Sequence, residues 1–372
     1  MSKRVIISGG GTGGHIFPAL AIAKALQRLD QQVEILFVGA LGRMEMEKVP
    51  AAGYQIIGLD IQGIQRKSLM KNLALPFKLI KSLLKARSIL KSFKPDVAVG
   101  VGGYASGPLL FAAANLKVPY LIQEQNSYAG LTNKWLAKKA DKICVAFDGM
   151  EAYFPQDKLL FTGNPIRKES VAIEGKRIEA AEFFGLSLDK KTILITGGSL
   201  GAGTLNKAIK KDIKKLIDAD VQVIWQTGKH YYRAVLQELD NQLVPSVKIL
   251  EFLNRMDLAY AMADVIISRS GAGTIAELCV VGKPVILVPS PNVAEDHQTK
   301  NALSLSSKKA AILIKDADAV EDLVPAVLSL LKDEKQAKEL SSNIAKLAIR
   351  DADEVIAKEI FRLMEKKGGL WN

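Results

Sequence analysis

Residues 4–15 read Arg-Val-Ile-Ile-Ser-Gly-Gly-Gly-Thr-Gly-Gly-His, and this stretch decides the fold of the first part of the chain. Its apolar, β-branched run predicts a buried strand over residues 4–8. A glycine loop follows over residues 9–14, a helix is expected from about Phe17, and a second strand is expected over residues 33–38. Because neighbouring parallel strands need a crossover helix, this order predicts a βαβ unit.

The same opening recurs in the second half of the chain. An apolar run over residues 192–196 leads into a glycine loop over residues 197–203, a helical stretch and a further apolar run over residues 221–225. A second repeat relates residues 95–122 to residues 263–287. Two halves with one layout predict an α/β protein of two doubly wound, Rossmann-like parallel-sheet domains that face a central cleft. Ligands are expected in that cleft.

The boundary between the two domains is expected between Gly163 and Asp189. We place it after residue 165, so that residues 1–165 form the N-terminal domain and residues 166–372 the C-terminal domain, each of ordinary domain length. The hydrophobic period of residues 337–366 predicts a helix, and such a terminal helix could pack back on the N-terminal domain.

The composition is that of a basic globular protein. Of the 372 residues 48% are hydrophobic, and 51 Lys and Arg against 39 Asp and Glu give a formal net charge of +12. Such a charge favours anionic partners, namely nucleic acid, phospholipid head groups or pyrophosphate-bearing substrates. Aromatic residues make up only 6% of the chain and no nucleic-acid-binding signature occurs, so no nucleic-acid partner is expected.

Several features indicate a cytoplasmic protein. Cys144 and Cys279 both lie in apolar stretches, which is typical of buried free thiols, and with only three histidines a zinc site is not expected. Residues 1–4 run directly into the first strand and leave no room for a signal peptide. Residues 97–116 carry no charge, but six Gly, Ser and Pro residues interrupt them, so no membrane span is expected.

Four glycine loops, over residues 9–14, 102–107, 197–203 and 271–273, each follow a strand and precede a helix. The first contains G-x-G-x-x-G, the pattern of a dinucleotide site. The strand expected after its helix, over residues 33–38, ends without the carboxylate that binds the ribose in such a site, so no NAD or FAD cofactor is expected. Each loop could be a tight turn required by packing, or could let a substrate approach the backbone and helix N-termini. Four such loops around one cleft favour a large phosphorylated or polyoxygenated ligand.

Paired carboxylates in Asp-Ala-Asp occur three times, at residues 218–220, 316–318 and 351–353. Carboxylate pairs can hold a divalent cation against a nucleotide diphosphate. Helix capping and solvated turns explain them better, and Asp318, which precedes a helix-like stretch, is a candidate N-cap. No protein-bound metal is therefore expected.

The segment over residues 68–91 alternates apolar side chains with Lys and Arg. One interpretation is an interfacial anchor whose apolar side chains enter an anionic membrane surface while the cations meet lipid head groups. The other is an ordinary amphipathic helix packed on a sheet. In the first interpretation the membrane-contacting residues are Leu73, Phe77, Lys78, Ile80, Lys81 and Leu83.

The glycine loops and their neighbours resemble, in order and over nearly the whole chain, the MurG-type transferases, which add N-acetylglucosamine to lipid-linked N-acetylmuramyl-pentapeptide. One such loop would be uninformative, whereas the ordered set is specific. The residues that carry the resemblance are Gly9–His15 with Phe17-Pro18-Ala19-Leu20, Gly102–Pro108, Glu124-Gln125-Asn126, Gly163–Arg167, Gly197-Gly198-Ser199 and Ser270–Glu277.

The resemblance implies a GT-B fold and an inverting transfer from UDP-N-acetylglucosamine to the C4 hydroxyl of undecaprenyl-pyrophosphoryl-N-acetylmuramyl-pentapeptide. This step converts lipid I to lipid II in peptidoglycan synthesis. It implies that the N-terminal domain meets the acceptor and the membrane and that the C-terminal domain holds the UDP-sugar. It further implies no cofactor, and a peripheral protein at the cytoplasmic face of the bacterial cell membrane.

The resemblance also implies roles for individual residues. Arg167 and Ser199 would contact the pyrophosphate, and Glu277 would accept hydrogen bonds from the ribose hydroxyls, which suits their chemistry. The backbone of Leu253 would read uracil and Gln298 would grip the sugar. The other implied donor contacts are Ala272, Gly273, Thr274, Ile275 and Ala276 and, from the opposite domain, Thr12, Gly13, Gly14 and Asn126.

A general base is needed near the acceptor hydroxyl, and His15 is the candidate because imidazole titrates near neutral pH. The alternative role for His15 is to bind or shape the acceptor diphosphate. Two positions depart from the pattern of the family. Leu200 stands where the family often has Gln, and Gln123 where it often has His.

Two other functions remain open from the sequence. A different GT-B transferase, such as a diacylglycerol glucosyltransferase, would share the donor-binding half but accept another lipid. A non-catalytic protein that binds a nucleotide-sugar or polyanion would show ligand affinity without release of UDP.

Overall fold

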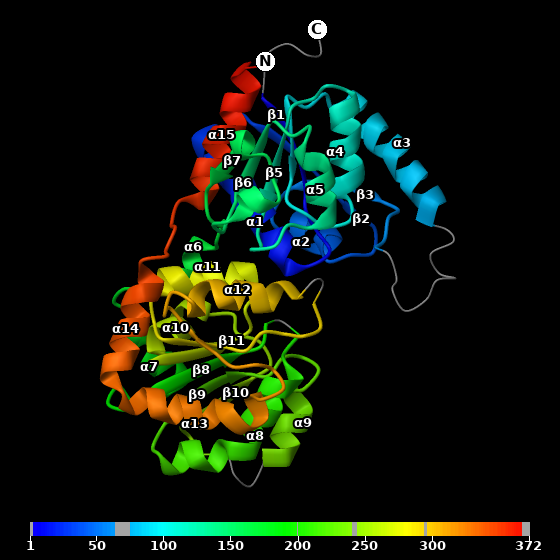
Figure 1. Ribbon diagram of the computed structural model, residues 1–372. Helices are drawn as coiled ribbons and strands as arrows, with labels where there is room; N and C mark the ends of the chain where they lie inside the picture. Colours follow the sequence, from blue (N-terminus) through cyan, green and yellow to red (C-terminus); the bar gives the residue numbers. More distant parts are fainter. Residues whose placement is uncertain (1–2, 64–74, 199, 240–243, 294–295, 367–372) are drawn as a thin grey trace. The chain divides into compact units, whose positions relative to one another are not determined.

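The computed structural model describes residues 3–63, 75–198, 200–239, 244–293 and 296–366. The chain divides into two compact units: unit 1 comprises the residues up to Ile166 and those from Asp351 onward, and unit 2 comprises Arg167–Arg350. In each unit helices cover both faces of one parallel sheet (Figure 1).

Unit 1 is built on a sheet of seven strands in the order β3-β2-β1-β4-β5-β6-β7, and every pairing is parallel. The order reverses between β1 and β4, which makes this pair the topological switch point where such sheets bind ligands. The strands are β1 (Arg4–Ser8), β2 (Glu34–Ala40), β3 (Gln55–Leu59), β4 (Val97–Gly100), β5 (Tyr120–Glu124), β6 (Lys142–Val145) and β7 (Leu159–Phe161).

Alternate residues of these strands enter different cores, as the period of a strand requires. Ile6 packs toward α3, α4 and α5, whereas Val5 and Ile7 pack toward α1 and α15. Both faces are covered, so the middle of β1, residues 5–7, is apolar throughout instead of alternating. The helices of unit 1 are α1 (Gly13–Leu29), α2 (Glu45–Ala51), α3 (Leu75–Phe93), α4 (Ser106–Asn115), α5 (Leu131–Ala137) and α15 (Ala352–Lys366), with 3-10 turns at Met150–Ala152 and Gln156–Lys158.

Unit 2 repeats this plan with six parallel strands in the order β10-β9-β8-β11-β12-β13, so its switch point lies between β8 and β11. The strands are β8 (Thr192–Thr196), β9 (Gln222–Gln226), β10 (Val247–Leu250), β11 (Val265–Ser268), β12 (Val285–Leu287) and β13 (Ile312–Leu313). The helices are α6 (Lys168–Val171), α7 (Arg177–Phe184), α8 (Gly203–Asp218), α9 (Tyr232–Leu239), α10 (Met256–Met262), α11 (Ala272–Val281), α12 (His297–Ser306), α13 (Ala319–Lys332) and α14 (Glu334–Ala345).

The predicted strands over residues 4–8 and 192–196 are confirmed with the same bounds. The first helix, however, begins at Gly13 and not near Phe17, because the Thr12 carbonyl already accepts hydrogen bonds from the N–H groups of His15 and Ile16. His15 therefore lies in the first turn of α1. The helical character expected over residues 337–366 is found in two helices, since α14 ends at Ala345 and α15 begins at Ala352.

Within the described residues no helix is both long and apolar enough to span a membrane. The uncharged stretch over residues 97–116 forms β4, a glycine turn and α4. Cys144 and Cys279 are both buried and unpaired, and burial raises the pKa of each thiol, that of Cys279 to about 12.

Candidate functional site

Two glycine loops meet at the switch point of the sheet in unit 1. They follow β1 and β4, and they approach so closely that the Gly10 N–H donates to the Gly102 carbonyl at 3.3 Å. Gly103 has a φ of +90°, and a Cβ there would lie 2.4 Å from the Gly10 carbonyl oxygen. Only glycine permits this approach, which leaves backbone groups at the carboxyl edge of the sheet.

His15 projects its ring onto these loops. Its Nδ1 lies 3.0 Å from the Gly10 carbonyl oxygen and 3.4 Å from Oγ1 of Thr12. Because a carbonyl oxygen can only accept, the shorter contact requires a proton on Nδ1. Nε2 of the neutral ring is then the acceptor nitrogen, and it lies 2.8 Å from the place of a Cβ on Gly102. The geometry therefore presents an imidazole whose acceptor nitrogen is Nε2, as a general base requires.

The loop after β5 is organised by Glu124, a buried carboxylate. It accepts from the backbone N–H of Asn126 at 3.1 Å, from the Gly130 N–H at 3.0 Å and from Nδ2 of Asn133 at 2.8 Å. Asn126, which the resemblance assigns to the donor site, is thus held in place by the residue two positions before it.

Gln123, one of the two departures from the family pattern, is fully buried. Its Nε2 donates to Oδ1 of Asn164 at 3.0 Å, and Nδ2 of Asn164 donates to the Gln125 carbonyl at 2.9 Å. The amide therefore links the end of β5 to the loop after β7. Its role in this chain is internal hydrogen bonding.

In unit 2 the glycine loop after β8 leads into α8. Gly201 has a φ of +81°, and a Cβ there would lie 2.0 Å from the Thr227 carbonyl oxygen, so this loop packs closely against the loop that follows β9. Asn206 of α8 connects the two loops. Its Nδ2 donates to the Thr227 carbonyl, and its Oδ1 accepts from the indole N–H of Trp225, both at 2.9 Å. Ser199 lies outside the described residues, and Leu200, the second departure, is 62% exposed.

Arg167 and Glu277 form the main charged contact at the edge of unit 2. Arg167, at the N-cap of α6, donates from Nε and Nη2 to Oε1 of Glu277 at 3.3 and 3.2 Å. The hydroxyl of Tyr260 in α10 donates to Oε2 at 3.4 Å. Burial raises the pKa of the Glu277 carboxyl above its usual value, while Arg167 and Tyr260 act in the opposite direction. This carboxylate is a strong acceptor of the kind that recognises vicinal hydroxyls.

The substitution Glu277→Gln should make thermal stability less dependent on pH. The pKa of Glu277 is raised in the folded protein, so its contribution to stability is full below the unfolded pKa of about 4.3 and is lost as the pH rises through the folded pKa. Glutamine does not titrate. The melting temperature of the variant minus that of wild type should therefore be larger at pH 7.5 than at pH 4. A difference that is the same at both pH values would contradict this expectation.

The other donor residues assigned by resemblance lie on loops and helix starts of the same edge. Gly271 is the N-cap of α11, so the first-turn N–H groups belong to Ala272, Gly273 and Thr274, whereas the Ile275 N–H donates to the Gly271 carbonyl at 2.9 Å and Ala276 follows. Gln298 lies in the first turn of α12, where its Oε1 accepts from the Ser290 N–H at 2.8 Å. Leu253 is buried between β10 and α10.

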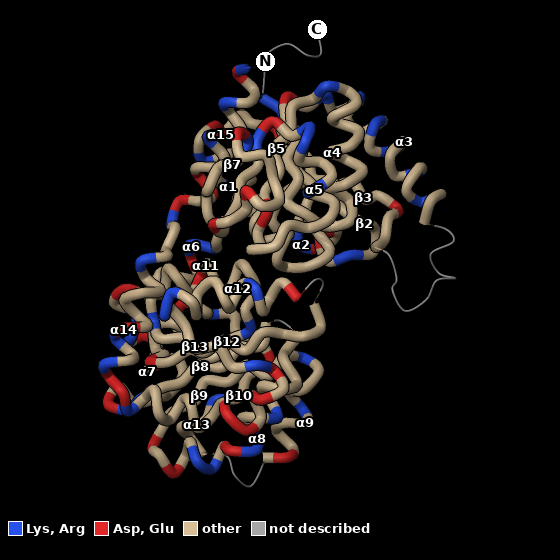
Figure 2. Tube along the Cα trace, viewed as in Figure 1, with Lys and Arg blue, Asp and Glu red and all other residues tan. Residues whose placement is uncertain are grey.

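Helix α3 carries Lys and Arg but no acidic residue (Figure 2). In the sequence no Asp or Glu occurs from residue 61 to residue 95. Phe77 is 78% and Ile80 56% exposed, and Lys81 is exposed beside them. Leu83 is half-buried. Lys78 donates to Oδ1 of Asp60 at 2.9 Å and thereby lowers the pKa of that carboxyl, and Leu73 lies outside the described residues.

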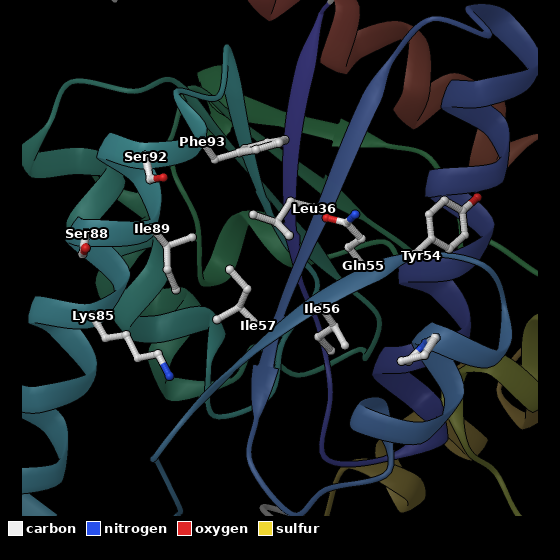
Figure 3. A pocket seen from close by; sticks show the side chains of 11 residues that line it. Leu36, Tyr54, Gln55, Ile56, Ile57, Lys85, Ser88, Ile89, Ser92 and Phe93 are labelled. Carbon is white, nitrogen blue, oxygen red and sulfur yellow. The ribbon is translucent and has the colours of Figure 1, made fainter.

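A groove of about 810 Å³ lies in unit 1 between α3 and the edge strand β3 (Figure 3). Ile56 and Ile57 come from the strand, and Lys85, Ile89 and Phe93 from the helix. None of the residues assigned to the donor, the acceptor or the membrane lines it. It lies along the side of the sheet, away from the carboxyl ends of β1 and β4.

The three Asp-Ala-Asp triplets are engaged within the protein. Asp316 accepts from Arg269 and from Oγ1 of Thr204, and Asp353 pairs with Arg28. Asp318 occupies the N-cap position of α13, although its side chain makes no capping hydrogen bond. Among the described residues no group of three or more His, Cys, Asp or Glu side chains is arranged to hold a metal ion.

Sequence reasoning assigned no role to Tyr260 or Glu124, although Glu124 belongs to a quoted motif. Tyr260 lies 17 residues from Glu277 on a different helix, so its contact depends on the tertiary fold. The only sequence signal for Glu124 was an acidic residue at the end of an apolar strand. An acidic residue there is often buried behind a ligand loop, where it needs hydrogen-bond donors.

Matches to known families agree with this arrangement. Residues 5–145 match the glycosyltransferase family 28 N-terminal domain, and residues 192–356 match the glycosyltransferase family 28 C-terminal domain. A calicheamicin glycosyltransferase shares the fold at a TM-score of 0.72 with 14% identity, over 99% of this chain and all of that one. The two family matches, together covering most of the chain and lying on its two parallel sheets, define the chain as a glycosyltransferase of the GT-B class.

Relatives that match over nearly their full length show which family within this class the chain belongs to. A protein of Parabacteroides distasonis is 56% identical over 98% of this chain and 99% of its own length, and one of Flavobacterium psychrophilum is 51% identical over 98% of both. Both are named UDP-N-acetylglucosamine–N-acetylmuramyl-(pentapeptide) pyrophosphoryl-undecaprenol N-acetylglucosamine transferase. The crystal structure of Acinetobacter baumannii MurG, 30% identical, matches over 97% of this chain and 99% of that one at a TM-score of 0.79. The chain belongs to the MurG family of N-acetylglucosamine transferases.

Proposed function

We propose that this enzyme transfers N-acetylglucosamine from UDP-N-acetylglucosamine to the C4 hydroxyl of undecaprenyl-pyrophosphoryl-N-acetylmuramyl-pentapeptide, the step from lipid I to lipid II. The match at 56% identity over 98% of the chain carries the proposal. The geometry adds a buried carboxylate paired with an arginine in unit 2 and an oriented imidazole in unit 1.

On the donor side, Glu277 accepts hydrogen bonds from the ribose hydroxyls and Arg167 donates to the pyrophosphate. Their mutual contact at 3.2 Å holds both side chains at one edge of unit 2 before the donor arrives. The first-turn N–H groups of α11 add partial positive charge near the phosphates. Ser199, the Leu253 backbone and Gln298 complete the contacts to phosphate, uracil and sugar. Thr12, Gly13, Gly14 and Asn126 are the remaining donor contacts in this proposal.

On the acceptor side, Nε2 of His15 takes the proton from the C4 hydroxyl as that oxygen attacks the anomeric carbon. The new bond joins O4 to C1, and the bond from C1 to the diphosphate oxygen breaks with its electron pair leaving on UDP. Attack opposite the leaving group inverts the anomeric centre. Arg167 and the helix N–H groups stabilise the charge that develops on UDP, which is the term that usually contributes most to such catalysis.

The test is an assay of purified protein with UDP-N-acetylglucosamine and a lipid-linked muramyl-pentapeptide, in which UDP release and the lipid-linked disaccharide are both measured. One series contains EDTA and the other Mg²⁺. Disaccharide formed in EDTA supports transfer by protein side chains alone. UDP-N-acetylglucosamine binding without any disaccharide in either series would refute the acceptor, and a diacylglycerol acceptor would then be assayed.

We also propose that α3 docks on an anionic membrane surface, which would place the enzyme peripherally at the cytoplasmic face of the cell membrane. Phe77 and Ile80 supply exposed apolar area, and Lys81 supplies charge for acidic head groups. Lys78 is paired with Asp60, so its share of the attraction is smaller.

Replacing Phe77 and Ile80 together with serine should weaken binding to vesicles that contain anionic phospholipid by about 100-fold or more, since each fully inserted side chain contributes roughly 1.5 kcal/mol or more and the two contributions add. Vesicle co-sedimentation measures the change. The matched control is Ile178→Ser in α7 of unit 2, which is 62% exposed and lies outside α3. Equal binding by the double variant and the control would remove α3 from the docking surface.

A further inference from the structure

Glu45 is a buried carboxylate that none of the assignments above uses. It opens α2, is 1% exposed and lies behind the first glycine loop of unit 1. Its Oε1 accepts from the Ala40 N–H at the end of β2 at 2.9 Å, and its Oε2 accepts from the Gly11 N–H at 2.8 Å. A buried acidic side chain is costly unless such hydrogen bonds satisfy it. Two backbone donors, one for each oxygen, meet this requirement.

The chain provides space for this carboxylate with two glycines. A Cβ on Gly10 would lie 2.2 Å from Oε1 of Glu45, and a Cβ on Gly39 would lie 2.6 Å from its Cγ. Any other residue at either position would displace the Glu45 side chain. Neither Gly10 nor Gly39 has a positive φ, so steric room and not backbone conformation is the reason for glycine here.

One peptide group connects Glu45 to His15. The Gly11 N–H that donates to Glu45 and the Gly10 carbonyl that meets Nδ1 of His15 at 3.0 Å belong to the same peptide unit. A carboxylate on the N–H side polarises the peptide and makes its carbonyl a better acceptor. The Gly10 N–H, which belongs to the preceding peptide unit, donates to the Gly102 carbonyl, so the backbone is also held directly before this peptide.

We propose that Glu45 is the positioning residue for His15, acting through the Gly10–Gly11 peptide to hold the proton on Nδ1 and leave Nε2 as the acceptor nitrogen. The assignment of a catalytic consequence rests on the proposed role of His15 as general base. Glu45 itself does not touch substrate, because it lies behind the loop.

The arrangement requires a carboxylate and not its amide. Both groups that face Glu45 are N–H donors, so an acceptor oxygen is needed on each side. In Glu45→Gln one side would present an NH₂ group to an N–H. That side is left without a hydrogen bond, and the peptide that carries the Gly10 carbonyl loses its polarising partner. Glu45→Asp keeps the charge but shortens the reach.

The kinetic test compares Glu45→Gln with Glu47→Gln, an exposed glutamate on the same helix. Loss of a positioning partner should lower kcat by about 10–100-fold, by analogy with the hydrogen-bond partners that orient metal-ligating histidines. The KM for UDP-N-acetylglucosamine should be unchanged, and Glu45→Asp should recover part of kcat. The control should behave as wild type.

A spectroscopic test separates this inference from the role of His15 in the reaction. Histidine labelled with ¹⁵N gives signals for only three residues, His15, His230 and His297, which His230→Gln and His297→Gln assign. At a pH where the ring is neutral, wild-type His15 should show a protonated Nδ1 and an unprotonated Nε2. In Glu45→Gln the two signals should shift toward a mixture of tautomers.

An Nε2–H tautomer in the wild-type protein would overturn the proposal without any variant, as would an unchanged tautomer in Glu45→Gln, even if kcat fell. A tautomer shift together with lower kcat supports the proposal. A tautomer shift with unchanged kcat also supports positioning by Glu45, and it would show that His15 is not the base.

Discussion

His15→Ala should lower kcat by about 10²–10⁴-fold, the usual contribution of a general base, while the KM for UDP-N-acetylglucosamine stays within about twofold. The reason is geometric. With Nδ1 committed to the Gly10 carbonyl at 3.0 Å, the ring offers Nε2 to the proton of the acceptor hydroxyl. Alanine removes the proton acceptor and leaves Arg167 and Glu277 in place, so donor binding should survive. Steady-state kinetics with both substrates varied measures the two effects.

Two further measurements decide between the roles open to His15. If it binds the acceptor diphosphate instead, His15→Ala should raise the KM for the lipid-linked acceptor with little change in kcat. Thermal unfolding and UDP binding by the variant check that α1 and the glycine loops are intact. A variant with wild-type kcat and wild-type KM for both substrates would remove His15 from the site.

Glu277→Ala should raise the KM for UDP-N-acetylglucosamine by about 10–100-fold, because a hydrogen bond to a charged group contributes roughly 1.5–3 kcal/mol. The carboxylate accepts from Arg167 on one oxygen and from Tyr260 on the other, so it is already oriented for the proposed contact with the ribose. Its removal also frees Arg167 from its partner. Since ribose and phosphate contacts form in the ground state, KM should change more than kcat.

The matched control for Glu277→Ala is Glu339→Ala, an exposed glutamate of α14 whose nearest cation, Lys309, is 3.7 Å away. Donor affinity is measured directly by calorimetry with UDP-N-acetylglucosamine in the absence of acceptor. Equal affinity for the donor in wild type and Glu277→Ala would show that the ribose is bound elsewhere.

Much of the fold could be predicted because the deciding strands are short apolar runs that end in glycine. The strands over residues 4–8 and 192–196 have the predicted bounds, since both faces of these strands are buried and, apart from Arg4 at the start of the first, every side chain is apolar or small. The start of α1 could not be predicted this way. Gly13 and Gly14 are poor helix formers, and the Thr12 carbonyl and the packing of the loops make the turn helical.

The site was predictable for residues that carry a recognisable pattern and less so for the residues behind them. Gly102 and Gly103 belong to such a pattern, and their close approach to the first loop explains the need for glycine. Glu45 belongs to a stretch with no distinctive spacing. Its partner Gly11 lies 34 residues away, and a contact of that kind is formed by the sheet and not by local sequence.

Because α15 belongs to unit 1, the two units can finish folding in only one order during synthesis. Ile356, Ile360 and Leu363 of α15 pack in the same core as Ile16 and Ile22 of α1, and Asp353 pairs with Arg28. Unit 2 is continuous in sequence and is finished on the ribosome once Arg350 has emerged. Unit 1 is therefore the last to be closed, and a ribosome that stops before α15 releases a chain in which the part of α1 that packs on α15 is uncovered.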